Sequence, residues 1–349
     1  MTRNRLHALT CLGVFFLSLL AVNGCAHQHL NAAHDPAGSL APSDAGPAAF
    51  TPAPVPEVSR ATDVMRVAGL DVAVGTRVVL FDEPGGYSAY RGPAYFNERK
   101  KDAPVSSPAE LAALIDRVVL HYDAAGSSAR CFEILQENRG LSCHFLLDVD
   151  GIIYQTLDLK ERAWHAGTSN SRSVGIEIAN IGAYPPSASD PLTRWYQRYP
   201  DGSTRLVLPP GSGVRRPEQA KSPARPAPVV GLIHGRRLVQ HDLTDAQYAA
   251  LIKLVAALCQ TFPRVSPDAP RIGGDPNAGV LPGLMTAADR HGFGGVVGHH
   301  HLTGEKVDPG PAFDWSITLT AGWSKLRATA EVLSSLPSLT MITSDGDSC

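Results

Sequence analysis

In this chain of 349 residues, side chains that could bind a metal or take part in catalysis are most concentrated between residues 298 and 315. The segment reads GHHHLTGEKVDPGPAFDW, in which three consecutive histidines, His299–His301, are followed by Lys306 and Asp308. Neutral imidazole and carboxylate groups are ligands that suit zinc, and a catalytic zinc ion typically keeps one of four positions for water. A lysine beside such ligands could stabilise the negative charge that develops on an attacked carbonyl oxygen. The segment therefore predicts a metal-dependent hydrolase.

Two strand-like segments could supply the remaining groups of such a site. Residues 117–122 (RVVLHY) form a β-branched run that ends near His121, and strand ends present side chains from a rigid scaffold. In residues 173–180 (SVGIEIAN) apolar residues alternate with small or acidic ones, which is the periodicity of a strand. A carboxylate inside such a strand is costly unless it is paired or used. His121 is therefore a candidate third metal ligand, and Glu177 a candidate general base.

Taken together, these segments resemble the type-2 N-acetylmuramoyl-L-alanine amidases, a family related to the peptidoglycan recognition proteins and the phage lysozyme-amidases. The resemblance spans roughly residues 115–182 and 285–316 and rests on His121, CHFLLD (143–148), WHAG (164–167), GIE (175–177) and the closing motif 298–315. It implies an α/β fold in which helices flank a single mixed β-sheet. Interleaved strand and helix patterns along the chain agree with that fold class.

The resemblance also implies a role for each matching residue. The three zinc ligands would be His121, His299 and Asp308. Glu177 would be the general base that takes a proton from the attacking water, and Lys306 would hold the oxyanion of the tetrahedral intermediate. The bond hydrolysed would be the amide between the lactyl group of N-acetylmuramic acid and the first L-alanine of the stem peptide, in intact peptidoglycan or in soluble muropeptides.

Two points about this site stay open in the sequence. Trp164 and His165 are expected to line the substrate cleft, although His165 could also serve only in packing. The loop between His299 and the aspartate is one residue shorter than is usual in the family, so His300 or His301 could replace His299 as the ligand. The alternative function is a muropeptide-binding protein without catalysis, and the complete ligand set favours the enzyme.

The first 60 residues predict export and attachment to a membrane. Arg3 and Arg5 precede an apolar run that ends in Val22-Asn23-Gly24-Cys25, which resembles a bacterial lipobox and predicts a signal peptide over 1–24 and lipidation of Cys25. A plain secretory signal cut nearby is the alternative. No retention aspartate follows the cysteine, so we expect the outer membrane, facing the periplasm. Residues 25–60 are rich in Ala and Pro and predict a flexible tether.

Cysteine usage fits an exported protein. By analogy with the related recognition proteins, we expect a disulfide between Cys131 and Cys143, with two reduced, buried thiols as the alternative. The pairing of Cys259 and Cys349 is left open.

Composition sets limits on partners. A formal net charge of -2 argues against a nucleic-acid partner, and we expect a monomer. No second apolar segment is long enough to cross a membrane.

The element pattern places one amidase domain over 61–335, followed by a tail over 336–349. Strands are expected near 117–122, 143–148, 152–157, 173–180 and 294–298, and helices near 107–116, 130–138, 244–261, 283–290 and 323–333. A Pro- and Arg-rich insertion over about 183–229 is typical of a loop, which could be a lid, a glycan contact or a surface excursion. Residues 60–105 are expected to wrap the domain.

Overall fold

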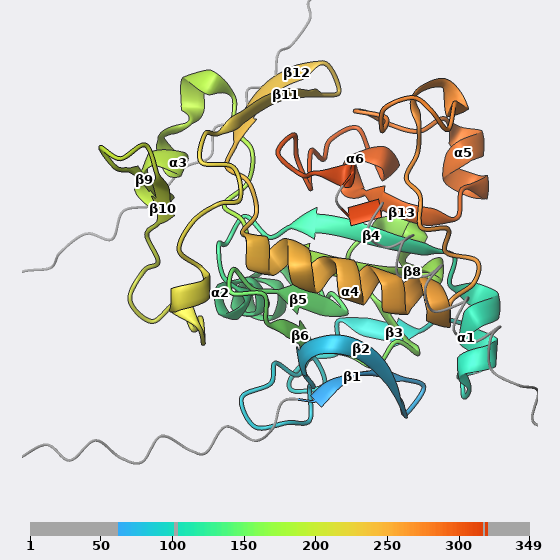
Figure 1. Ribbon diagram of the computed structural model, residues 1–349. Helices are drawn as coiled ribbons and strands as arrows, with labels where there is room; N and C mark the ends of the chain where they lie inside the picture. Colours follow the sequence, from blue (N-terminus) through green and yellow to red (C-terminus); the bar gives the residue numbers. More distant parts are fainter. Residues whose placement is uncertain (1–61, 101–103, 317, 320–349) are drawn as a thin grey trace, which may run out of the picture. The chain divides into compact units, whose positions relative to one another are not determined.

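A seven-stranded mixed sheet forms the centre of the computed structural model, which describes residues 62–100, 104–316 and 318–319 (Figure 1). In spatial order the strands are β1 (Thr62–Val67), β2 (Leu70–Val79), β6 (Ile153–Gln155), β5 (Phe145–Leu147), β8 (Ser173–Ile178), β4 (Arg117–Tyr122) and β13 (Gly295–Gly298). The pairs β1–β2 and β5–β6 are antiparallel and the other four are parallel. This arrangement confirms the predicted fold class, a single mixed sheet flanked by helices.

Helix α4 (Asp245–Thr261) covers one face of the sheet and crosses in front of it in Figure 1. Its start at Asp245 follows from a capping box, in which the Thr244 hydroxyl accepts from the Gln247 amide and the Gln247 side chain accepts from the Thr244 amide. Its buried stripe packs into the main core with alternate residues of β4, β5 and β8.

The opposite face of the sheet is covered by α2 (Ser128–Glu133), which continues into a turn of π-helix (Ile134–Arg139). Side chains alternate between the two faces along each strand. Val118, Leu120, Ile176 and Ile178 belong to the core beneath α4, and so their neighbours in sequence, among them His121 and Glu177, point to the α2 side.

Several shorter elements complete this part of the fold. They are α1 (Pro108–Leu114), α5 (Ala287–Gly292), α6 (His299–Leu302) and the small antiparallel pair β3 (Phe96–Glu98) with β7 (Glu161–Ala163). Every strand and helix predicted between 107 and 298 is present, with ends shifted by a few residues. The predicted helix over 130–138 is α2 together with the π-helix.

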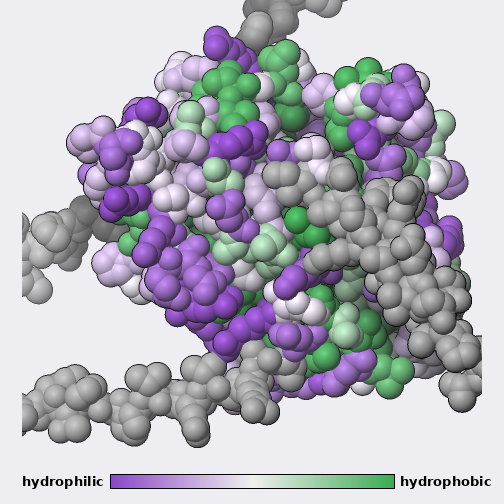
Figure 2. Space-filling model, viewed as in Figure 1, coloured by the Kyte–Doolittle hydropathy of each residue, from purple (hydrophilic) through white to green (hydrophobic). Residues whose placement is uncertain are grey.

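Two segments differ from expectation. The N-terminal part of 60–105 does not merely wrap the domain, because β1 and β2 extend the central sheet and β2 pairs with β6. The insertion expected to be loop contains α3 (Asp190–Trp195) and the hairpin β9 (Tyr196–Arg198)–β10 (Thr204–Leu206). A second hairpin, β11 (Val229–Ile233)–β12 (Arg236–Gln240), begins where the insertion ends. Figure 2 shows apolar side chains gathered over this second hairpin at the top of the view, where Val230 and Leu232 are 49% and 56% exposed.

The predicted disulfide between Cys131 and Cys143 is not formed, and both residues are free, buried thiols. They belong to one apolar cluster with Leu135, Leu146 and Tyr154, where a thiol packs as a small hydrophobic group. Burial raises the pKa of both thiols well above the ordinary value, so they are poor nucleophiles for thiol chemistry.

Several expectations fall on residues outside the described ranges. These are the signal peptide, Cys25, the tether, the helix near 323–333, Cys349 and the tail. None of the described helices is long and apolar enough to cross a bilayer.

Candidate metal centre

The register of three parallel strands brings the predicted ligands together. His121 of β4 lies opposite Glu177 of β8. On the other side of β4, Gly298 at the end of β13 lies opposite Leu120, so the chain delivers His299, the first residue of α6, beside His121. The segment after α6 then returns Asp308 to the same point.

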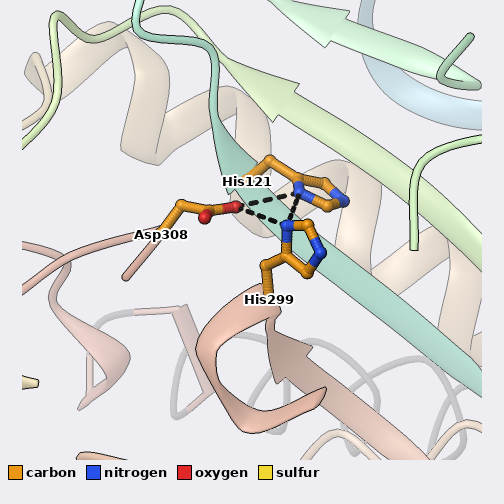
Figure 3. Close-up of side chains that lie close together, drawn as sticks. All are labelled: His121, His299 and Asp308. Atoms are coloured by element: carbon orange, nitrogen blue, oxygen red, sulfur yellow. Dashed lines mark hydrogen bonds and ion pairs between the residues drawn. The ribbon is translucent and has the colours of Figure 1, made fainter. Parts of the chain in front are cut away.

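His121, His299 and Asp308 turn one donor atom each toward a common centre (Figure 3). The two imidazole Nδ1 atoms are 3.0 Å apart. The Asp308 Oδ2 atom lies 2.9 Å from Nδ1 of His121 and 3.1 Å from Nδ1 of His299. All three residues are buried or nearly so.

This triangle fits a metal ion. At zinc-to-ligand distances of about 2.0–2.1 Å, tetrahedral donors lie roughly 3.3 Å from one another, close to the separations found here. Two neutral imidazoles that turn Nδ1 lone pairs toward each other and toward a carboxylate repel, and a cation between them removes the repulsion. Two histidines and one aspartate also form a donor set that zinc accepts, with a fourth position left for water or substrate.

Beyond the ligands, a chain of hydrogen bonds fixes the ring of His121. Its Nε2 lies 3.0 Å from Nδ1 of His165, whose own Nε2 lies 3.3 Å from the Ser173 hydroxyl. That hydroxyl donates to the Ser169 carbonyl at 2.8 Å. The chain is consistent when His121 donates from Nε2, which leaves Nδ1 free to bind a metal.

Gly175 makes room for this arrangement. A Cβ atom at residue 175 would lie 2.6 Å from Nδ1 of His165, so only glycine lets the imidazole lie against β8. The glycine of the GIE segment and the histidine of the WHAG segment are therefore parts of one contact. His165 lines the cavity, as expected, and it also orients His121.

The electrostatics of the centre favour metal binding at neutral pH. Burial, together with the neighbouring His299, lowers the pKa of His121 to about 4, so its imidazole is neutral. Burial alone would raise the pKa of Asp308, but the close contacts of its carboxylate with His121 and His299 hold that pKa below its usual range. A neutral imidazole and an ionised carboxylate are the forms that bind metal, so metal capture displaces no proton from either group.

His300 and His301 do not belong to the triangle. Nδ1 of His300 lies 3.0 Å from the Asp308 carbonyl oxygen. Nδ1 of His301 accepts from the Gly298 amide at 2.9 Å, and its Nε2 lies 2.7 Å from the Leu281 carbonyl. Both rings therefore shape the loop that carries the other ligands, and the structure selects His299 from the three.

A cavity of about 250 Å³ opens onto the three donor atoms. The other predicted site residues, Glu177, Lys306, Trp164 and His165, all line it. The Trp164 ring is held by a hydrogen bond from its Nε1 to the Asn97 side chain at 3.0 Å. The structure thus gathers the whole predicted set around one space, on the α2 side of the sheet.

Glu177 is a buried carboxyl group in this cavity. Burial raises its pKa well above the ordinary value, and the nearby carboxylates of Asp308 and Asp123 raise it further. Lys306 and Arg139 act in the opposite direction. A carboxyl group with a raised pKa beside a metal site is suited to accepting and returning a proton.

Two residues with a place in the site are missed by sequence reasoning. His234, at the turn of the β11–β12 hairpin, has its Nε2 2.9 Å from the Lys306 carbonyl oxygen. Gln240, at the end of the same hairpin, donates to the Pro309 carbonyl and accepts from the Ala312 amide, both at 3.0 Å. The sequence favours only a solvated or packing role for His234. No local pattern marks either residue, since both contacts join segments about 70 residues apart.

His144 has a structural role. It is fully buried, its Nδ1 accepts from the Gly175 amide at 3.1 Å, and burial lowers its pKa to about 3. It is a neutral structural histidine behind His165.

Residues 111–311 match the Amidase_2 family, described as N-acetylmuramoyl-L-alanine amidase. A search of curated proteins found no match.

Solved structures similar to the chain include AmpDh3 from Pseudomonas aeruginosa, with 18% identity, a TM-score of 0.33 and coverage of 68% of this chain and 73% of that one. The AmiD amidase from E. coli, solved with the substrate anhydro-N-acetylmuramic acid-L-Ala-D-gamma-Glu-L-Lys, has 18% identity, a TM-score of 0.33 and coverage of 66% of each chain. The Ph2119 endolysin from a Thermus scotoductus bacteriophage has 14% identity, a TM-score of 0.34 and coverage of 70% and 99%.

Proposed function

The chain belongs to the Amidase_2 family of N-acetylmuramoyl-L-alanine amidases, and on that premise we propose that it is a zinc-dependent hydrolase of the amide between N-acetylmuramic acid and L-alanine. The observation that carries the proposal is the triangle of His121, His299 and Asp308 donor atoms at the edge of the cavity that Glu177 and Lys306 line. An amide is a weak electrophile, so a site that cleaves it needs an activated water and a stabilised oxyanion.

In this proposal each side chain has a role that follows from its position in the site. Zinc held by the triangle would supply Lewis-acid polarisation of the amide carbonyl and acidify a water molecule. Glu177 takes the proton of that water and passes it to the departing amine of L-alanine. Lys306 places a cation where negative charge develops on the former carbonyl oxygen. His165 keeps the ring of His121 in the orientation that turns Nδ1 to the centre.

The substrate class and address are part of the same proposal. The AmiD amidase was solved with a muropeptide as its substrate, and we assign a muropeptide or peptidoglycan substrate to this chain by family. The lipobox at Cys25 and the tether that follows support an enzyme anchored in the outer membrane, within reach of the cell wall. Its role there would be wall remodelling or the recycling of wall fragments.

The second candidate is a binding protein without catalysis on the same scaffold. Such a protein has no need of a complete donor set or of a carboxylate beside it. His121, His299, Asp308, Glu177 and Lys306 are all present and share one cavity, which favours the enzyme.

The proposal is tested by mass spectrometry of muropeptides incubated with protein that begins after Cys25, with and without a zinc chelator. We expect release of stem peptides with a free L-alanine amine, loss of that release on chelation, and recovery when zinc is added back. Muropeptides that stay intact but co-purify with the zinc-loaded protein would overturn the enzyme in favour of the binding protein.

A further inference from the structure

The β11–β12 hairpin has two faces, and apolar side chains are exposed on one of them. A Cβ atom at Gly231 would lie 2.7 Å from Pro311, so one face of β11 rests on residues 303–311, which we call the metal loop because it carries the ligand aspartate. Side chains alternate between the faces of a strand. Val230 and Leu232 therefore point away from the metal loop, and they are 49% and 56% exposed.

The segment beside the hairpin turn adds further exposed apolar side chains. The His234 amide donates to the Pro282 carbonyl at 2.9 Å, which joins the hairpin to residues 270–284. Ile272 and Leu284 of that segment are exposed. Figure 2 shows apolar side chains over the hairpin at the top of the view and again to its right, over the segment that precedes α5. Single exposed apolar residues need no explanation, but a group of them on joined segments indicates a binding surface.

The charge of the hairpin is positive only. Arg236 and Arg237 are exposed, and residues 229–240 contain no Asp or Glu. The strand register places Arg237 opposite Leu232, so a cation lies beside the apolar side chain on the outward face. Apolar side chains can leave water for the acyl boundary of a membrane while neighbouring guanidinium groups stay at the level of the phosphates. The outward face is therefore complementary to an anionic lipid surface.

A second copy of the chain fits this face less well. In a contact related by twofold symmetry each hairpin meets its own image, so Arg236 and Arg237 would lie near the same arginines of the other copy. A stable protein interface also involves roughly 20–30 residues a side. The outward face offers far fewer side chains than that.

The predicted lipid anchor explains how a small surface could suffice. Residues 26–61 separate Cys25 from Thr62, where the described part of the chain begins. At about 3.3 Å per residue a chain of this length spans at most about 120 Å, so a domain anchored at Cys25 stays within reach of the bilayer. The tether makes docking an intramolecular step at a high effective concentration, and contacts that are weak alone then suffice.

We propose that the outward face of the β11–β12 hairpin docks the domain on a membrane of anionic phospholipids. Val230 and Leu232 enter the boundary between headgroups and acyl chains, and Arg236 and Arg237 lie against the phosphates. The strength of docking rests on the proposed lipid anchor at Cys25. Because the opposite face of the hairpin contacts the metal loop, docking holds the metal centre close to the membrane, where the proposed activity would act on the adjacent wall or its fragments.

The test places tryptophan reporters in zinc-loaded protein that begins at Cys25. The protein is coupled through the Cys25 thiol to a maleimide lipid in vesicles, with Cys349→Ser in every variant to avoid a second attachment. Leu232→Trp reports on the hairpin, and Leu70→Trp, at a side chain of β2 that is 58% exposed, is the matched control. Quenching of the added fluorescence by brominated phospholipids measures contact with acyl chains, on vesicles with and without phosphatidylglycerol.

We expect anionic vesicles to quench Leu232→Trp at least threefold more than Leu70→Trp, and neutral vesicles to quench it less. In the Leu232→Trp protein, Arg236→Gln and Arg237→Gln should each lower the ratio of docked to free hairpin about fivefold, the usual effect of one cation near such a surface. Val230→Ser should lower the same ratio about fivefold through lost apolar contact. The exposed Arg91→Gln should leave it unchanged. Circular dichroism checks that each variant is folded.

The opposite outcomes are equally definite. Equal quenching of the two reporters, absence of quenching on anionic vesicles, or quenching that does not respond to Arg236→Gln and Arg237→Gln would overturn the docking face. Self-association in sedimentation velocity that Leu232→Ser abolishes, without quenching of the hairpin reporter, would make this face a contact between copies of the chain.

The proposed hydrolysis is measured separately, on soluble muropeptides, and Leu232→Ser should not change it. Hydrolysis without docking would overturn the membrane face and leave the proposed function intact. Docking by a zinc-loaded protein that hydrolyses no muropeptide would overturn the proposed function and keep the membrane face.

Discussion

Glu177 and Asp308 lie in one cavity, but their surroundings shift their pKa values in opposite directions. Close contacts with two histidines keep the pKa of Asp308 low, whereas burial keeps the pKa of Glu177 high. Pairs of groups whose surroundings push their pKa values apart divide into a permanent charge and a proton carrier. Asp308 is therefore suited to hold a metal, and Glu177 to move a proton.

Replacing Glu177 with Gln should leave zinc binding in place and reduce hydrolysis of muropeptides by about 10²–10⁴-fold, the usual contribution of general acid–base catalysis. The amide keeps the size of the side chain and loses only its capacity to take a proton. Atomic absorption measures whether zinc binding is unchanged, and mass spectrometry measures the loss of muropeptide hydrolysis. Glu305→Gln, a change at an exposed carboxylate that lines the same cavity, is the control and should stay within threefold of the parent.

The residues alone predict a metal-binding segment at 298–315 and a candidate ligand at His121, whereas the full ligand set is what the resemblance to the family implies. Strand alternation alone indicates that Glu177 faces away from the isoleucines, and the closing motif sets the order of His299, Lys306 and Asp308. The sequence favours His299 among three adjacent imidazoles but leaves His300 and His301 open, because the choice depends on which ring the loop turns inward. The contact of His165 with His121 could not be predicted either, because it depends on how side chains pack between β4 and β8.

At the scale of elements, the β11–β12 hairpin braces the loop that carries Lys306 and Asp308. His234 contacts the Lys306 carbonyl, Gln240 contacts Pro309 and Ala312, and a Cβ at Gly231 would meet Pro311 at 2.7 Å. The hairpin is therefore a support for the metal loop, and it is built from residues 229–240, where the sequence predicts no strand. Likewise, β2 is missed because glycine interrupts it and few of its residues are buried.

Substituting His234 with Ala should lower kcat about fivefold and leave zinc content unchanged. One neutral hydrogen bond is worth about 1 kcal/mol, and loss of it lets the Lys306 backbone move away from its place beside the oxyanion. His234→Gln, which keeps an N–H donor, should recover most of the loss, and Arg237→Ala, an exposed change in the same hairpin, should have no effect. Steady-state kinetics and metal analysis measure the outcome. A drop in zinc content, or an unchanged kcat in His234→Ala, would contradict a positioning role.

At the scale of the whole domain, Arg99 fastens the N-terminal segment to the sheet. Its buried guanidinium donates to the carbonyls of four residues that surround the WHAG segment and the start of β8, Leu159, Asn170, Ser171 and Ser173. Burial lowers the pKa of Arg99 to about 9, which leaves it charged at neutral pH. A single side chain thus donates hydrogen bonds to several backbone carbonyls that are shielded from solvent.

Arg99→Met should destabilise the domain by about 3 kcal/mol, because carbonyls that stay buried lose their donors. Urea unfolding followed by circular dichroism should show a lower midpoint with an unchanged m value. The exposed Arg91 is the matched control, and Arg91→Met should unfold at the parent midpoint. A midpoint that does not move in Arg99→Met would show that the N-terminal segment is held by β1 and β2 alone.

The donor atoms of His121 and His299 meet across 178 residues of chain. During synthesis the first of them leaves the ribosome long before the second, so no stretch of nascent chain that ends before β13 owns a metal site. Because a metal ion that binds only the folded form adds to its stability, the proposed zinc site would fill late, once both histidines are in place. A fragment cut between the two histidines would lack part of the proposed ligand set and would not gain that stability.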